Sequence, residues 1–189
     1  PVRGNHDGSW NNMMTRLSPL LTETIETSHY TRTLSDNLTF IGLDSERSAG
    51  DQASWLEDQL SDPVRASHRF VIGFHRPLYP SAGGHAGWSD GKTHWMPIFR
   101  QYAGRIVVVS GHNHAMAREQ VDGVDFVTSG GGGAPLYSCS LRHEHTKFCA
   151  NKYGYYVCDA ELHCLGYEID VETGTKAMID AFEIIGAAN

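Results

Sequence analysis

Hydrophobic and polar positions alternate along the first two thirds of the chain in a pattern that predicts helices and strands in succession. Ala53, Leu56 and Leu60 fall on one side of a helical projection, and such an apolar stripe is typical of a helix packed on a core. Short continuous apolar runs are typical of strands that are buried on both faces. The predicted helices cover residues 10–22, 49–60 and 93–102. The predicted strands of this part cover residues 29–33, 38–43, 69–74 and 106–109.

From residue 114 onward the pattern predicts mainly β-structure. Turn residues at Asp122-Gly123 and Thr173-Gly174 separate successive apolar runs. Residues 138–152 are interpreted as a loop. The predicted strands of this part cover residues 115–121, 124–128, 153–159, 163–170 and 176–185. No repeat or linker divides the sequence, so we predict a single domain over residues 1–189, of α/β class, passing into a largely antiparallel second sheet.

Composition narrows the classes of function. The chain has 189 residues with 15 Lys+Arg against 22 Asp+Glu, a formal charge of -7. Non-specific binding to nucleic acid needs a basic surface, so no nucleic-acid partner is expected. No apolar run reaches the roughly 18 residues of a membrane span, and no membrane partner is expected. The sequence starts at Pro1 and not at Met, so we expect it to be a processed or incompletely read chain.

The four cysteines all lie in the last third of the sequence, at Cys139, Cys149, Cys158 and Cys164. No two of them form a C-x-x-C pair, so the common zinc-binding patterns do not apply. Two alternatives remain open, namely buried free thiols or two disulfides. Disulfides would indicate an exported protein, periplasmic or extracellular.

Several of the 11 histidines come directly after a predicted strand. His112 and His114 follow a buried strand and Gly111, and residues two apart in extended backbone point the same way, so both rings can converge on one place or on two metals side by side. His75 follows another apolar strand. A polar run, residues 4–8, begins the chain between two glycines. Because ligands collect at the carboxyl ends of strands in open α/β sheets, we expect these segments to meet there.

Each of these features also has an ordinary explanation. A single histidine at the end of a strand is more often a hydrogen-bonded structural residue than a metal ligand. The run Asn5-His6-Asp7-Gly8 on its own is typical of a surface turn. Two neighbouring neutral imidazoles beside a buried strand suit a divalent metal better. The occurrence of three such segments in one short chain favours the functional interpretation.

Taken in order, Gly4-Asn5-His6-Asp7, then His75, then Gly111-His112-Asn113-His114 resemble the last three motifs of the calcineurin-like metallophosphoesterases. Residues 73–79, Gly-Phe-His-Arg-Pro-Leu-Tyr, look most like the purple acid phosphatases and their bacterial relatives. The glycine-rich residues 128–137 are similar to a segment of those bacterial enzymes. The resemblance covers nearly the whole chain. It implies the C-terminal part of a four-layer α/β/β/α sandwich, with mixed and antiparallel sheets.

The resemblance also implies roles for individual residues. The metal ligands it implies are Asn5, His75 and His112 on one metal and His114 on the other. His6 would face the substrate and stabilise the phosphoryl group or protonate the leaving oxygen. His85 would lie above the substrate phosphate. Asp7 would orient His6, although a turn-stabilising aspartate is an equal alternative.

The implied reaction is hydrolysis of phosphate monoesters, as in acid phosphatases. Two divalent or mixed-valence ions, such as Fe, Zn or Mn, would clamp the phosphate and activate a water molecule. An imidazole at the leaving group adds general-acid catalysis. The expected partner is therefore a small phosphorylated substrate.

Two earlier motifs of the family, Asp-x-His and a Gly-Asp motif, are not matched in this sequence. Gly50-Asp51 leads into a predicted helix and not out of a strand. We therefore expect an N-terminally truncated domain that binds metal weakly alone, turns over little or no substrate, and tends to aggregate through exposed core surface. Two alternatives remain: a phosphodiesterase of the same superfamily, or a non-catalytic metal-binding module. A substrate pocket is expected between the loops of residues 80–92 and 138–152.

Overall fold

The computed structural model describes residues 1–21 and 25–184 and has a mixed α/β architecture. The α-helices are α1 (Trp10–Leu17), α2 (Gly50–Ser61), α3 (Ser89–His94) and α4 (Met96–Gln101). The strands of the large sheet are β1 (Tyr30–Ser35), β2 (Leu38–Gly42), β3 (Arg69–Gly73), β4 (Ile106–Ser110), β5 (Met116–Val121), β6 (Val124–Ser129) and β7 (Thr146–Ala150). The strands of the small sheet are β8 (Gly154–Cys158), β9 (His163–Ile169) and β10 (Lys176–Glu183).

The large sheet is mixed and has seven strands in the order β1-β2-β3-β4-β6-β5-β7. Its centre, β2-β3-β4-β6, is parallel. β1, β5 and β7 pair antiparallel at the two sides. The small sheet is antiparallel, in the order β10-β9-β8. The parallel centre places the carboxyl ends of β3 and β4 at one edge, which is where the candidate site lies.

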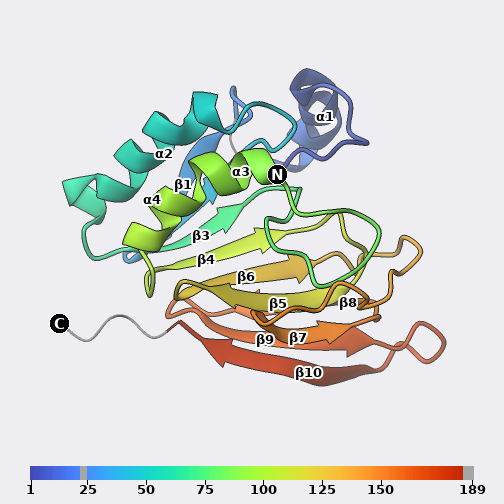
Figure 1. Cartoon of the computed structure of the whole chain (residues 1–189). Coiled ribbons are helices and arrows are strands. Elements are labelled where there is room, and N and C mark those ends of the chain that lie inside the picture. The colour runs from blue at the N-terminus through green and yellow to red at the C-terminus, as the bar shows by residue number, and fades with distance from the viewer. Residues whose placement is uncertain (22–24, 185–189) are drawn as a thin grey trace.

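Two apolar layers hold these elements together. On one face of the large sheet, α2, α3 and α4 lie across the strands (Figure 1), and Trp95 and Phe99 are fully buried against Phe74 and Phe126. On the other face, Val107 and Val127 pack against Tyr156 and Phe182 of the small sheet. The described residues therefore form three layers: helices, large sheet and small sheet.

The predicted α/β class and the mixed and antiparallel sheets are confirmed. Most predicted elements appear within one or two residues of their expected ends, including the β1-β2 hairpin and the helix that begins at Gly50. The first helix is shorter than predicted, because it ends at Leu17 and Pro19 lies in a short 3₁₀ turn. Residue 22 of that prediction and residue 185 of the last predicted strand lie outside the described residues.

Two predictions about elements were wrong. The single helix predicted over residues 93–102 is two helices, since Pro97 in the first turn of α4 cannot donate a backbone hydrogen bond into a continuous helix. Residues 146–150, interpreted as loop, form β7 on the edge of the large sheet against β5. β7 begins with two polar residues and is largely half-exposed, so its apolar run is shorter than the runs used to recognise buried strands.

The cysteines form two disulfides, Cys139–Cys149 and Cys158–Cys164. The free-thiol alternative is therefore wrong. The first disulfide ties the segment before β7 to β7 itself, and the second joins the paired ends of β8 and β9. None of the helices in residues 1–21 and 25–184 combines the length and the apolar character needed to cross a membrane.

Candidate metal centre

The candidate site is built on two neighbouring parallel strands. β3 and β4 run side by side, with Gly73 opposite Val109, and each is followed by a loop that carries a histidine. The two loops remain hydrogen-bonded to each other just beyond the strands, because the Gly111 N–H donates to the carbonyl of His75 over 3.1 Å. His75 and His112 therefore project from adjacent loops at one edge of the sheet. Their rings meet edge to face, with centroids 4.8 Å apart.

Asn5 reaches the same place from the start of the chain. Its Oδ1 lies 2.8 Å from Nε2 of His75. The turn around it is closed by Asp7, whose carboxylate accepts the Gly4 N–H over 2.7 Å. Gly4 is buried directly against the His75 ring, where a Cβ atom would lie 2.9 Å from the imidazole. A glycine is needed at this position because the backbone itself packs on the ring.

His112 takes an unusual backbone conformation to complete the group. Its φ is 63°, in the left-handed region that residues other than glycine rarely adopt. Its Nδ1 lies 3.0 Å from His75 Nε2. Strained backbone of this kind persists where surrounding contacts determine it, and it is common at functional sites.

Asn5 Oδ1 and His112 Nδ1 lie 2.8 and 3.0 Å from His75 Nε2, which is the spacing of neighbouring ligand atoms on one metal ion. Nitrogen ligands bind Zn²⁺ at about 2.0–2.1 Å, so neighbouring ligand atoms lie roughly 3 Å apart. Without a cation, a proton on either ring nitrogen could join His75 Nε2 to His112 Nδ1, depending on the tautomers of the two rings. A divalent cation at this place could accept one lone pair from each of the three atoms. The residues present therefore fit one divalent metal ion.

Electrostatics keep both rings in the form that binds metal. Burial, together with the neighbouring His85 and His75, lowers the pKa of His112 to about 3. Burial is also the largest cause that lowers the pKa of His75. Both rings are thus neutral at physiological pH, and a metal ligand must carry a free lone pair. The described residues contain no group of three or more His, Cys, Asp or Glu side chains arranged for a metal ion, so the converging set is limited to two rings and an amide.

His114 lies to one side of this group. Its Nδ1 is 2.9 Å from the carbonyl oxygen of Pro135, and its ring stacks on Tyr137 with centroids 4.4 Å apart. No hydrogen bond joins it to Asn5, His75 or His112 in the part of the chain that the structure describes. His112 therefore belongs to the group, whereas the ring of His114 is held beside it by Pro135 and Tyr137.

His85 covers the group from the solvent side. Its exposed ring stacks on His112 with a centroid distance of 4.0 Å and an interplanar angle of 27°. It also meets Tyr137 edge to face at 5.9 Å. Tyr137 therefore lies between His85 and His114. Sequence reasoning assigned it no role, although it ends the glycine-rich segment that carried part of the family resemblance.

His6 and Asp7 are both exposed at the first motif. His6 is close enough that its charge is one of the smaller causes lowering the pKa of His75, after burial. Asp7 closes its own turn through Gly4, and the described residues show no hydrogen bond from it to the His6 ring. The geometry of Asp7 matches the turn-stabilising alternative.

Arg76 was also missed by sequence reasoning. Its guanidinium forms a two-point ion pair with Glu46, at 2.7 and 2.9 Å, and its Nη1 lies 3.4 Å from His112 Nε2. The ion pair fixes a positive charge beside the rings. The only signal in the sequence was that Arg76 follows His75 directly; Glu46 is 30 residues away along the chain.

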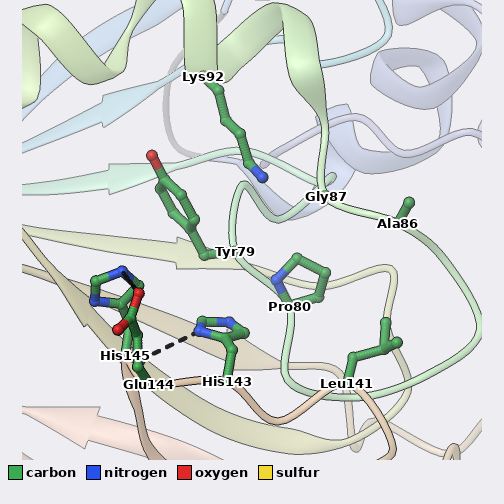
Figure 2. A pocket seen from close by; sticks show the side chains of 9 residues that line it. All are labelled: Tyr79, Pro80, Ala86, Gly87, Lys92, Leu141, His143, Glu144 and His145. Carbon is green, nitrogen blue, oxygen red and sulfur yellow. Dashed lines mark hydrogen bonds and ion pairs between the residues drawn. The ribbon is translucent and has the colours of Figure 1, made fainter.

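A pocket of about 380 Å³ lies beside the His85 loop (Figure 2). It is formed by the two loops from which the sequence predicted a pocket, together with α3. Lys92 points into it, with its ammonium 4.6 Å from the centre of the Tyr79 ring. The residues that line it are Tyr79, Pro80, Ala86, Gly87, Lys92, Leu141, His143, Glu144 and His145. Ala86, the residue directly after His85, is one of these lining residues.

No protein-family model matches this sequence, and no curated protein matches it either. Solved structures are similar in fold. One is GAP50, the anchor in the inner membrane complex of Plasmodium, with a TM-score of 0.68 and 15% identity over 87% of this chain and 56% of GAP50. A second is PhoD, with a TM-score of 0.58 and 13% identity over 98% of this chain and 50% of PhoD.

At these identities the likeness concerns the fold alone. The chain spans about half the length of the two structures, 56% of one and 50% of the other. This chain therefore shares its fold with GAP50 and PhoD over most of its length.

Proposed function

We propose that this chain is the metal-binding part of a phosphoric ester hydrolase, acting on small phosphate monoesters in the manner of an acid phosphatase. The proposal rests on one observation above all, that Asn5 Oδ1 lies 2.8 Å and His112 Nδ1 lies 3.0 Å from the same atom, Nε2 of His75. The fold likeness to PhoD supports it. In this proposal residues 1–189 are a single, N-terminally truncated calcineurin-like domain.

In this proposal, residues of the chain would bind the metal ions and the substrate. Asn5, His75 and His112 would hold one ion, and His114 would turn its free Nε2 toward a second. The ions, Fe, Zn, Mn or similar, would supply positive charge for the phosphate oxygens and an activated water molecule. His6 would donate a proton to the leaving oxygen, and His85 would contact the phosphate. Arg76, fixed by Glu46, would add positive charge beside the bound anion.

The ligand set predicts weak metal binding by this chain alone. Two neutral rings and one amide carry no negative charge, and a bridging carboxylate would normally offset the charge of two cations. We therefore propose that the chain by itself has little or no activity. Activity would need a protein that also supplies the Asp-x-His and Gly-Asp carboxylates.

The test has two parts. Calorimetric titration with Zn²⁺ and Mn²⁺ should give weak binding to the chain, and His112→Ala should abolish it. His143→Ala, which changes an exposed histidine of the neighbouring loop, is the matched control and should bind like the unchanged chain. Equal binding by all three proteins would mean that the metal site does not exist.

The second part concerns activity. Hydrolysis of p-nitrophenyl phosphate is measured with Mn²⁺ or Fe/Zn, for the chain alone and for a protein extended upstream of Pro1 to include the two carboxylate motifs. We expect activity from the extended protein that His112→Ala removes. Full activity in the chain alone would contradict the proposed dependence on the additional ligands. Assay of bis-p-nitrophenyl phosphate in parallel distinguishes the phosphodiesterase alternative.

A non-catalytic module is a second candidate, because the likeness to GAP50, an anchor, has a TM-score of 0.68. In that case the extended protein would bind metal without hydrolysing either ester. The two disulfides favour an exported location, periplasmic or extracellular, for either candidate. Oxidation of all four cysteines in protein purified from its native compartment would support that location.

A further inference from the structure

The loop that carries His85 depends on one buried side chain. Residues 81–87 belong to no helix or strand, yet Ala82 and Gly83 are buried while His85 is exposed. Buried backbone carbonyls in such a loop need hydrogen-bond donors, because an unsatisfied buried carbonyl is costly. The donor that meets most of this need is Asn113.

The Asn113 amide makes three hydrogen bonds to this loop. Its Nδ2 lies 2.8 Å from the carbonyl oxygen of Ala82 and 3.0 Å from those of Gly83 and His85, so its two N–H groups are shared among these three acceptors. Asn113 is completely buried, and its Oδ1 has no hydrogen-bond partner. Three acceptors around one nitrogen also fix which way the amide points. The side chain therefore acts here purely as a donor.

The position of Asn113 in the sequence links these hydrogen bonds to the proposed metal ligands. It stands between His112 and His114, so its backbone is one residue from a proposed metal ligand on either side. Its side chain points inward to the loop while His112 turns toward His75 and Asn5. The same short segment thus fixes both the metal ring and the carbonyl of His85, whose ring stacks on His112 at 4.0 Å.

Apart from the contacts of the His85 ring with His112 and Tyr137, other hydrogen bonds hold the beginning of the loop but not the His85 backbone. The Ser81 N–H donates to Glu119 over 2.9 Å, and the Gly83 N–H donates to the carbonyl of Ser138 over 2.8 Å. The described residues show no other hydrogen bond to the His85 backbone. Loss of the Asn113 donors would leave the first part of the loop in place and release its His85 end.

From these contacts we propose that Asn113 is a positioning residue, which sets His85 over the metal centre through three hydrogen bonds to the loop. The expected effect on catalysis rests on the proposed function, in which His85 would contact the phosphate. The structural part of the inference, the control of the His85 position by Asn113, stands independently of any activity.

The first test measures the position of His85 without metal or substrate. Asn113→Asp keeps the shape of the side chain but replaces the donor NH₂ with an acceptor. In NMR spectra, the His85 ring protons should carry a ring-current shift from His112 that Asn113→Asp removes, and His112→Ala identifies that shift. Should Asn113→Asp fail to fold, Asn113→Ser, which retains one donor, takes its place and should reduce the shift.

Gln52→Glu is the matched control. Gln52 is also buried, and its amide donates to the carbonyls of Asp44 over 2.9 Å and Ser48 over 3.0 Å, away from the His85 loop. It should lower the stability of the protein, as Asn113→Asp does, without changing the His85 shift. An unchanged shift in the Asn113 variants, or the same change in Gln52→Glu, would overturn the proposal.

The second test is a double-mutant cycle on hydrolysis of p-nitrophenyl phosphate by the extended protein. We expect Asn113→Asp to lower kcat/KM by about 10–100-fold, since a displacement of about 1 Å can cost roughly 100-fold. In a His85→Ala background the same change should cost less than about 2-fold. Metal affinity by calorimetry should stay within about 3-fold.

These outcomes separate the two proposals. If the extended protein hydrolyses no ester, the proposed function fails while the NMR test still decides the role of Asn113. If hydrolysis is present and Asn113→Asp costs as much with Ala at position 85 as with His, Asn113 does not act through His85, and the positioning role is refuted. If metal binding is lost together with activity, Asn113 serves the metal ligands and the proposal is equally wrong.

Discussion

At the scale of single residues, strand-end reasoning from the sequence placed His75 and His112 correctly at one edge. Parallel strands end together, and a histidine after each is brought to the same place by topology alone. Arg76 with Glu46 and the ring of Tyr137 could not be derived in this way. Their positions depend on loops from distant parts of the chain, which the pattern of apolar residues does not describe. The left-handed backbone of His112 likewise has no signal in residue type, because glycine is what normally marks such a position.

Glu119 gives a pH prediction at this scale. It is 1% exposed, and burial raises the pKa of its carboxyl group to about 8, although the Ser81 N–H opposes the shift. The unfolded chain therefore loses this proton near pH 4.5, before the folded protein does. Stability should fall as pH rises from about 4.5 to 8, with a total loss of a few kcal/mol at most, since each pKa unit is worth about 1.4 kcal/mol.

Glu119→Gln keeps an acceptor for Ser81 and removes the titration. Urea unfolding from pH 5 to pH 9 should therefore show a flatter dependence of the free energy of unfolding in Glu119→Gln than in the unchanged chain. Glu144→Gln is the control, because the Glu144 side chain is 86% exposed and its loss should leave the slope as it was. Parallel slopes for the unchanged chain and Glu119→Gln would mean that Glu119 is ionised in the folded protein.

At the scale of elements, buried strands and amphipathic helices were predictable because each has a distinct apolar period. β7 and the break between α3 and α4 were not, since an edge strand needs little apolar surface and a proline can begin one helix as readily as end another. The glycine-rich segment after β6 was recognised by resemblance only. The structure gives it a physical reason, because the backbone there passes close to two other parts of the chain.

Gly130 and Gly132 separate the glycines that this segment needs from those it does not. A Cβ atom on Gly130 would overlap the carbonyl of Asn113, and backbone at this point cannot move aside easily. Around Gly132 there is open space. We expect Gly130→Ala to lower the free energy of unfolding by about 2 kcal/mol or more, as overpacking does, and Gly132→Ala to change it by less than about 0.5 kcal/mol. Urea unfolding of both variants measures this, and equal effects would show that the approach of the two backbones is not tight.

At the scale of the whole molecule, the family resemblance implied the C-terminal part of a four-layer α/β/β/α sandwich, and the described residues form three layers, with the small sheet outermost on its side. Its inner face packs on Val107 and Val127, whereas its outer face carries apolar side chains that are only partly covered by other described residues. Val157 is 52% exposed, Leu165 36% and Met178 60%. Val157 and Leu165 are direct partners across β8 and β9, so this is a continuous surface and not a scatter of single residues.

Such a surface should make the chain associate with itself, because contact between two copies removes apolar area from water at about 25 cal/mol per Å². We expect light scattering and sedimentation velocity to detect association that grows with protein concentration, and that grows further near the isoelectric point of about 5.8, where repulsion between copies is least. Replacing Val157 and Met178 with Lys should reduce it strongly. Val64→Lys is the matched control, since Val64 is 83% exposed in a separate 3₁₀ turn. A Val64→Lys protein that becomes as monodisperse as the double variant would show that added charge, and not the outer face of the small sheet, controls association.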